Sequence, residues 1–214
     1  MIGDVIKIKA KYLNSARQVL NVLMSDIVNR KSHYSISIAG ESGSGKSTLA
    51  IALSKLLESM EIPAIILHMD DYFILPPASN HQNRMESFEN VGPHEVRLDL
   101  LDQHLRDIGN SATAQLKKPL SDYSNNIILE ENIDIPERAV VIVEGTYTSL
   151  LGEINSRIFI DRDYKTTFED RKKRARDPIT PFIEQVLEIE HQIIKKHKAL
   201  ADVVIDASFK IVKP

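Results

Sequence analysis

An α/β fold with a mostly parallel central sheet and helices on both faces is predicted by the order of elements along this chain. Strand-like runs alternate with amphipathic helical segments, which is typical of parallel sheets. One run, AVVIVEG at 139–145, is almost continuously apolar, as expected of a strand that is buried on both faces. The alternation and the buried run together indicate three layers: helices, sheet and helices.

The elements can be placed in order from local patterns. Apolar residues recur with helical spacing over 11–30, and a strand at 33–40 ends in glycine before an amphipathic helix at 46–60. Further strands are predicted at 63–69, 139–145, 157–161 and 202–206, with an edge strand at 209–213 and a short hairpin strand within 129–139. The remaining helices are predicted at 93–109, 166–176 and 181–200.

One domain is expected to span 1–214, because this length buries one sizeable core rather than two. Its N-terminal helix forms an extension over 1–32. Residues 72–93 are rich in Pro, Asn and Ser and are predicted to be a loop. A connection of that length is usually functional, so we expect it to cover a substrate.

Composition narrows the classes of function. The net charge is −3, with 43% hydrophobic and 27% charged residues, so no nucleic-acid or membrane-surface partner is indicated. No apolar run reaches the roughly 18 residues of a membrane span. There is no cysteine, which excludes disulfides and thiolate catalysis. With no recognisable secretory signal, we expect a soluble, cytoplasmic protein.

The segment GESGSGKST, from Gly40 to Thr48, matches the phosphate-binding pattern G-x-x-x-x-G-K-[ST]. Its glycines allow a tight turn whose backbone N–H groups point at phosphate oxygens. Lys46 is placed to reach the β- and γ-phosphates, and the Ser47 hydroxyl to bind Mg²⁺. The predicted nucleotide-binding residues are Gly40, Ser42, Gly43, Ser44, Gly45, Lys46, Ser47 and Thr48.

A phosphate loop predicts a nucleoside triphosphate but does not define its use. A GTP-binding switch protein would carry N-K-x-D and D-x-x-G motifs, and neither occurs at a suitable place. A mechanical ATPase would need a longer chain. The pattern therefore favours a small kinase with a second substrate site beside the γ-phosphate.

Carboxylates follow two of the predicted strands. Asp70 and Asp71 come after the second strand; because side chains alternate along a strand, they cannot both face the phosphate loop, and we expect two different roles. The alternative interpretation, favoured without further context, is that the two acids belong to a solvent-exposed turn. Glu144 ends a buried strand, where open α/β sheets place ligand-contacting groups. It is predicted to contribute to the Mg²⁺ site, the alternative being a cap on the following loop.

Two further groups have alternative interpretations. Arg171 and Arg174 share a helical face and could neutralise charge during phosphoryl transfer; the alternative is a solvated helix face. His94 begins a predicted helix behind the long loop, where it would contact substrate or serve as a cap or surface residue.

From about residue 35 to 206 the chain resembles the P-loop alcohol kinases, the family of uridine–cytidine kinase, phosphoribulokinase and bacterial pantothenate kinase. The segments that carry the resemblance are GESGSGKST, LHMDDYF, VVIVEG, IFIDRDYKTTFEDRKKRARD and KHKALADVVID. The resemblance implies a P-loop NTPase fold with an arginine-bearing lid at 164–180, and an ATP-dependent kinase that uses Mg²⁺.

The resemblance also implies individual roles. Asp70 becomes the general base on the acceptor hydroxyl and, with Ser47 and Glu144, a group of the metal site. Lys46, Arg171 and Arg174 become catalytic cations. By their positions in the chain, Asp71 is left to brace the loop, and Tyr72, Phe73 and His94 would line the acceptor site.

The chain departs from uridine kinases around the acceptor. Their Asn-Phe-Asp-His-Pro stretch is replaced by ENVGPHEV, in which only Pro93 matches. In KPLSDYSNN, Ser121 stands at the tyrosine position and Asn126 near the histidine. A nucleoside such as uridine or cytidine is the first expected acceptor. The alternatives are another alcohol (a sugar, a hydroxy acid or pantothenate), or a non-enzymatic ATP sensor. The resemblance also makes a homo-oligomer an expectation.

Overall fold

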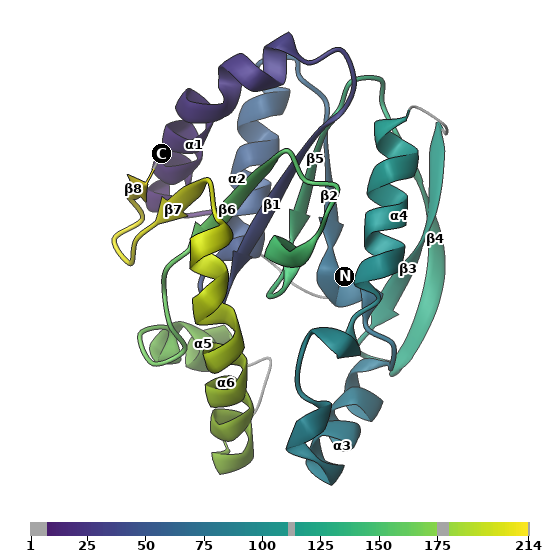
Figure 1. Ribbon diagram of the computed structural model, residues 1–214, viewed down its shortest axis with the longest axis vertical. Coiled ribbons are helices and arrows are strands. Elements are labelled where there is room, and N and C mark those ends of the chain that lie inside the picture. Colours follow the sequence, from purple (N-terminus) through teal and green to yellow (C-terminus); the bar gives the residue numbers. More distant parts are fainter. Residues whose placement is uncertain (1–7, 111–113, 175–179, 214) are drawn as a thin grey trace.

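The computed structural model describes residues 8–110, 114–174 and 180–213. Its core is a six-stranded sheet in the order β2-β5-β1-β6-β7-β8 (Figure 1). The parallel strands are β1 (Tyr34–Gly40), β2 (Ala64–His68), β5 (Val140–Glu144), β6 (Ser156–Ile160) and β7 (Val203–Ile205). The edge strand β8 (Ile211–Lys213) runs antiparallel to β7. The predicted α/β fold with a mostly parallel sheet is confirmed.

Helices cover both faces of the sheet, and the packing of β5 shows which helices lie on each face. Val140 and Ile142 pack in one core cluster with α1 (Ala10–Asn29) and α2 (Lys46–Glu58). Val141 and Val143 pack in a second cluster with α4 (Leu98–Gly109). Successive side chains of a strand point to opposite faces, so a strand between two helical layers must be apolar throughout.

Helix α1 belongs to the first helical layer. Its Ser15 hydroxyl donates a hydrogen bond to the Phe209 carbonyl at 2.5 Å, and the Tyr12 and Phe209 rings meet edge to face at 4.6 Å. These contacts join the N-terminal helix to the C-terminal segment across the core.

The segment predicted as a loop at 72–93 contains a helix, α3 (Pro77–Glu86), followed by 3₁₀ turns at Phe88–Asn90 and Pro93–Glu95. Pro77 occupies the start of α3, where its fixed φ suits a helix and its missing N–H costs nothing. The next helix, α4, consequently begins at Leu98 and not at residue 93.

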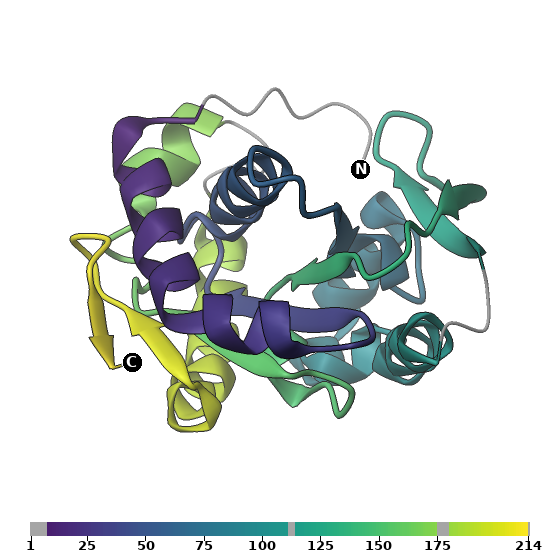
Figure 2. The ribbon, with the colours of Figure 1, turned by 90° about the horizontal axis from the view of Figure 1, so that it is seen from above.

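A second departure is the antiparallel hairpin of β3 (Gln115–Asp122) and β4 (Ile127–Asp134), of which only a short strand within 129–139 was predicted. Most of β4 is exposed, so it lacks the apolar alternation that signals a half-buried strand. In Figures 1 and 2 the hairpin lies at the periphery, outside α4 and the central sheet.

The C-terminal helices flank the site. Helix α5 (Phe168–Arg174) precedes α6 (Pro181–Ile194), which continues as a 3₁₀ helix over Lys195–Leu200. In the described part of the chain, no helix has the length and apolarity to cross a membrane.

Candidate active site

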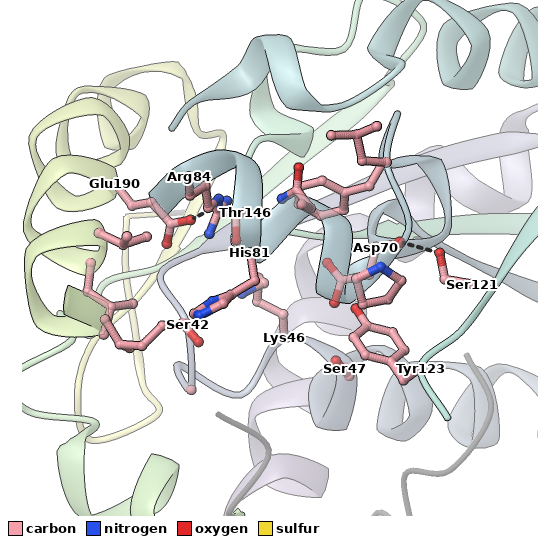
Figure 3. A pocket seen from close by; sticks show the side chains of 18 of the residues that line it. Ser42, Lys46, Ser47, Asp70, His81, Arg84, Ser121, Tyr123, Thr146 and Glu190 are labelled. Carbon is pink, nitrogen blue, oxygen red and sulfur yellow. Dashed lines mark hydrogen bonds and ion pairs between the residues drawn. The ribbon is translucent and has the colours of Figure 1, made fainter. Parts of the chain in front are cut away.

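A cavity lies at the carboxyl ends of the central strands, where open α/β sheets bind ligands (Figure 3). The phosphate loop, the turn after β2, helices α3 and α6, and the β3–β4 hairpin all contribute to its wall. Segments far apart in the sequence therefore meet around one space.

The phosphate loop joins β1 to α2. Gly43 and Gly45 have φ values of 74° and 108°, which favour glycine, and a Cβ on Gly43 would lie 2.7 Å from Arg171 Cγ. The Lys46 ammonium donates to the Glu41 carbonyl at 3.0 Å. The loop is thus wrapped tightly, with its lysine folded back along it.

The predicted nucleotide-binding residues all belong to this loop, but they do not all face the cavity. Ser42, Gly43, Lys46 and Ser47 line it. The remaining members are absent from the cavity wall: Gly40, Ser44, Gly45 and Thr48. The side chain of Ser44 is completely buried.

Ser47 and Glu144, the residues expected to bind Mg²⁺, lie in contact. The Ser47 hydroxyl donates to Glu144 Oε1 at 3.0 Å, and His68 Nδ1 lies 2.7 Å from the same oxygen. Burial opposes protonation of His68, but the hydrogen bond and charge of Glu144 outweigh it and raise the His68 pKa. His68 was not predicted; it stands opposite Glu144 in the register of β2 and β5, a pairing that only the structure shows.

The oxygen donors of Ser47 and Glu144 fit Mg²⁺. This ion is usually held by one or two protein oxygens together with substrate phosphates and water. Among the described residues there is no cluster of three or more His, Asp or Glu side chains that could hold a metal alone. The donor set therefore suits a metal that arrives with a nucleotide.

Asp70 and Asp71 occupy different environments. Asp70 lines the cavity, whereas Asp71 is fully buried and accepts hydrogen bonds from Lys118 Nζ at 2.9 Å and the Ser121 amide at 3.0 Å. The expected separation is present, but its predicted reason is wrong. Both residues lie in a 3₁₀ turn, Met69–Tyr72, and the strand has already ended at His68.

The three residues predicted to line the acceptor site lie in different environments. Phe73 lines the cavity. Tyr72 is completely buried in the core, with its hydroxyl 2.9 Å from His104 Nδ1, and burial raises its pKa. His94 is exposed and absent from the cavity wall. The expectation is corrected for Tyr72, which the 3₁₀ turn directs into the core, and for His94, which lies in the turn Pro93–Glu95 and does not reach the cavity wall.

Several cavity residues were missed. Asn80, His81 and Arg84 come from α3, Tyr123 from the hairpin turn and Glu190 from α6. Pro77 is a helix-start signal that could have revealed α3.

Glu190 had a clear signal of its own. It stands seven residues after Ile183 and three after Leu187, so it interrupts the apolar face of α6. An acid at such a position has a partner inside the molecule.

That partner is Arg84. Its guanidinium donates to both carboxylate oxygens of Glu95, at 2.5 and 2.8 Å, and to Glu190 Oε1 at 3.1 Å. Asn80 Nδ2 and the Gly92 amide also donate to Glu95, at 3.0 and 2.7 Å. Burial is the main cause that raises the pKa of Glu190, and the nearby Glu95 charge adds to it against the opposing effect of Arg84.

The predicted lid arginines are only partly described. Arg171 is buried and donates to Glu184 Oε1 at 3.0 Å and to the Tyr164 carbonyl at 3.3 Å, and it does not line the cavity. Arg174 ends α5, and its side chain lies outside the described part, as do residues 175–179. The catalytic role of both arginines stays a prediction.

The fold and the loop between β1 and α2 define a P-loop nucleotide-binding protein. The model of the Phosphoribulokinase / Uridine kinase family matches residues 35–207, so the chain belongs to that family. It is a small-molecule kinase with an alcohol group as acceptor.

Individual relatives agree with this membership. A uridine kinase from Macrococcus caseolyticus (strain JCSC5402) is 29% identical over 184 residues, covering 79% of this chain and 86% of the relative. A solved structure described as a possible uridine kinase from Bacillus stearothermophilus has a TM-score of 0.63 and 21% identity, covering 88% and 97% of the two chains. D-glycerate 3-kinase from Cryptococcus neoformans var. grubii has a TM-score of 0.61 and 15% identity, covering 92% and 97%.

Proposed function

We propose that this protein transfers the γ-phosphoryl group of ATP to a hydroxyl of a small acceptor, with uridine or cytidine as the first candidates. The observation that carries the proposal is that Asp70 lines the same cavity as Lys46 and Ser47 (Figure 3). A carboxylate beside a phosphate loop can orient an acceptor hydroxyl and take its proton.

In the proposed reaction, backbone amides of the phosphate loop and Lys46 hold the triphosphate. Ser47 and Glu144 would hold Mg²⁺, with Asp70 in the same cavity; the bound ion supplies positive charge against the phosphate oxygens. The acceptor oxygen forms a bond to the γ-phosphorus as the bond to the ADP oxygen breaks, and the hydroxyl proton passes to Asp70. Lys46, Arg171 and Arg174 offset the charge that develops.

The nucleoside acceptor is supported by relatives described as uridine kinases. The hairpin nevertheless differs from theirs in a way that affects recognition. Asn126, near the position of the family histidine, accepts a hydrogen bond from the Ala78 amide at 2.7 Å and so caps α3. Tyr123 and Ser121 are the hairpin side chains that line the cavity. Sugars, hydroxy acids and pantothenate therefore stay as alternative acceptors.

An acceptor screen tests the proposal. ATP and Mg²⁺ are supplied with single nucleosides, sugars, hydroxy acids or pantothenate, and ADP release and the phosphorylated product are measured. We expect acceptor-dependent ADP release with equal formation of product. Tight ATP binding without acceptor-dependent ADP release from any compound would instead identify a nucleotide sensor.

A further inference from the structure

The charged groups around the cavity are unevenly distributed. Among the described residues that line it, Asp70, Glu144 and Glu190 are carboxylates, whereas Lys46 and Arg84 are the permanent cations. Lys46, Ser47 and Glu144 come from the phosphate loop and the end of β5. Arg84 and Glu190 come from the wall formed by α3 and α6, and Asp70 from the turn after β2.

Arg84 is already neutralised. Two buried carboxylates, Glu95 and Glu190, accept hydrogen bonds from its guanidinium, and its side chain is only 15% exposed. Through Nε and Nη2, one cation is thus paired with two carboxylates, and this excess of negative charge disfavours an incoming carboxylate or phosphate.

Glu190 itself opposes a further anion. It is 8% exposed, and burial with the nearby Glu95 charge raises its pKa against the opposing charges of Arg84 and Lys46. Like charges placed together in such a site cost binding energy and exclude the wrong ligand.

The same groups suit hydroxyls. A hydroxyl both donates and accepts, so it can donate to a Glu190 oxygen and accept from the second N–H of Asn80 Nδ2, whose first N–H donates to Glu95. The apolar side chains of Val186 and Leu187 line the cavity beside Glu190 and offer a surface to the carbon skeleton of a ligand.

We propose that the acceptor is an uncharged polyhydroxy compound, and that Glu190 is a specificity-determining residue that accepts hydrogen bonds from its hydroxyls and rejects acceptors bearing a carboxylate or phosphate. This inference rests on the proposed kinase function. Under this inference, sugars and nucleosides remain candidate acceptors, whereas hydroxy acids and pantothenate are excluded.

Matched pairs of acceptors that differ in charge test the inference with the unmodified protein. Suitable pairs are glycerol and glycerate, pantothenol and pantothenate, fructose and fructose 6-phosphate, and uridine and orotidine, which carries a carboxylate and keeps all ribose hydroxyls. For every pair that is phosphorylated, we expect kcat/KM for the neutral member to exceed that of the anion by about 10²-fold or more.

The Glu190→Gln variant tests the residue. It keeps the shape but loses the charge, so we expect KM for the neutral acceptor to rise about tenfold, with kcat and KM for ATP nearly unchanged. The preference for the neutral member should fall about tenfold. Glu86→Gln, an exposed carboxylate on α3, is the control and should change neither value.

The outcomes are distinguishable. Phosphoryl transfer to an anion with a higher kcat/KM than to its neutral partner would overturn this inference and leave the kinase function standing. An unchanged preference in Glu190→Gln, with an unaltered KM for ATP as evidence of folding, would remove Glu190 from the assignment. No transfer to any acceptor would overturn the proposed function and the inference with it.

Discussion

Asp70 and Asp71 are adjacent in the chain but lie in different environments. One lines the cavity; the other is fully buried against the hairpin. The 3₁₀ turn directs the side chains differently, and Ser121 links to both residues, through its hydroxyl to the Asp70 carbonyl and through its amide to the Asp71 carboxylate. Substitutions of the two acids are therefore expected to change different properties: turnover for Asp70 and stability for Asp71.

Asp70→Asn removes the group proposed to accept the proton but preserves its shape. We expect turnover to fall roughly 10²–10⁴-fold, the range of general-base catalysis, with ATP affinity nearly unchanged. Steady-state kinetics and ATP titration check both values. Full turnover in this variant would exclude Asp70 as the base.

Asp71→Asn should instead act on stability. It breaks the buried pair with Lys118, whose side chain is 3% exposed and keeps Glu131 as a second partner at 2.6 Å. We therefore expect a loss at the low end for a broken buried pair, about 3 kcal/mol in the free energy of unfolding. The matched control is Glu130→Gln, in the exposed pair with Lys117 on the same hairpin, which should cost less than about 1 kcal/mol. Equal losses in urea denaturation would contradict the distinction.

At the scale of elements, the phosphate loop is tied to the segments that follow β6. The buried carboxylate of Glu41 accepts from the Tyr164 amide at 2.7 Å, and its other oxygen lies 2.7 Å from His191 Nδ1 on α6. Asp163 then organises the turn before α5, because its carboxylate accepts from the Thr166 amide at 2.7 Å. This turn leads into the arginine-bearing helix.

Asp163→Ala should destabilise the protein by about 1 kcal/mol at pH 7, the usual value of a capping side chain. The Thr166 backbone hydrogen bond lowers the Asp163 pKa, so the contribution is present above the ordinary aspartate pKa. It is lost as pH falls through the lowered folded-state value. Denaturation of both proteins across pH checks this expectation. A difference in the free energy of unfolding between the unmodified protein and Asp163→Ala that grows toward acid pH would contradict it.

Asp163→Asn is the matched control for the same site. Asparagine keeps an oxygen that accepts from Thr166 but cannot titrate. It should retain most of the stability at pH 7, and its contribution should not change with pH.

At the scale of the whole molecule, helical layers bury both faces of the sheet and leave the carboxyl ends of the strands for ligands. ATP with Mg²⁺ should therefore stabilise the entire domain. At a free concentration of about 100 times Kd the gain is about 2.7 kcal/mol, which corresponds to a rise in Tm of about 5–10 °C.

A thermal-shift titration checks this gain. Chelation of the metal with EDTA should remove most of it, and Lys46→Ala should lose it because the phosphates lack their cation. A full shift in that variant would contradict nucleotide binding at the predicted loop.

The sequence alone determined the elements whose signals are local. The phosphate loop, the buried run of β5 and the amphipathic face of α2 each carry their pattern within a few residues, because backbone geometry and burial act there directly. The placement of Asp70 and Glu144 after their strands followed from the same reasoning.

Only the tertiary structure decided how the rest of the site is built. The Pro, Asn and Ser residues of α3 are typical of loops, so the helix could not be recognised from composition. The buried Tyr72 hydroxyl is paired with His104, 32 residues away. The Arg84–Glu95–Glu190 cluster joins positions up to 106 residues apart, so no local pattern could reveal it. Charge pairing in a low-dielectric interior depends on distance in space, and folding alone sets that distance.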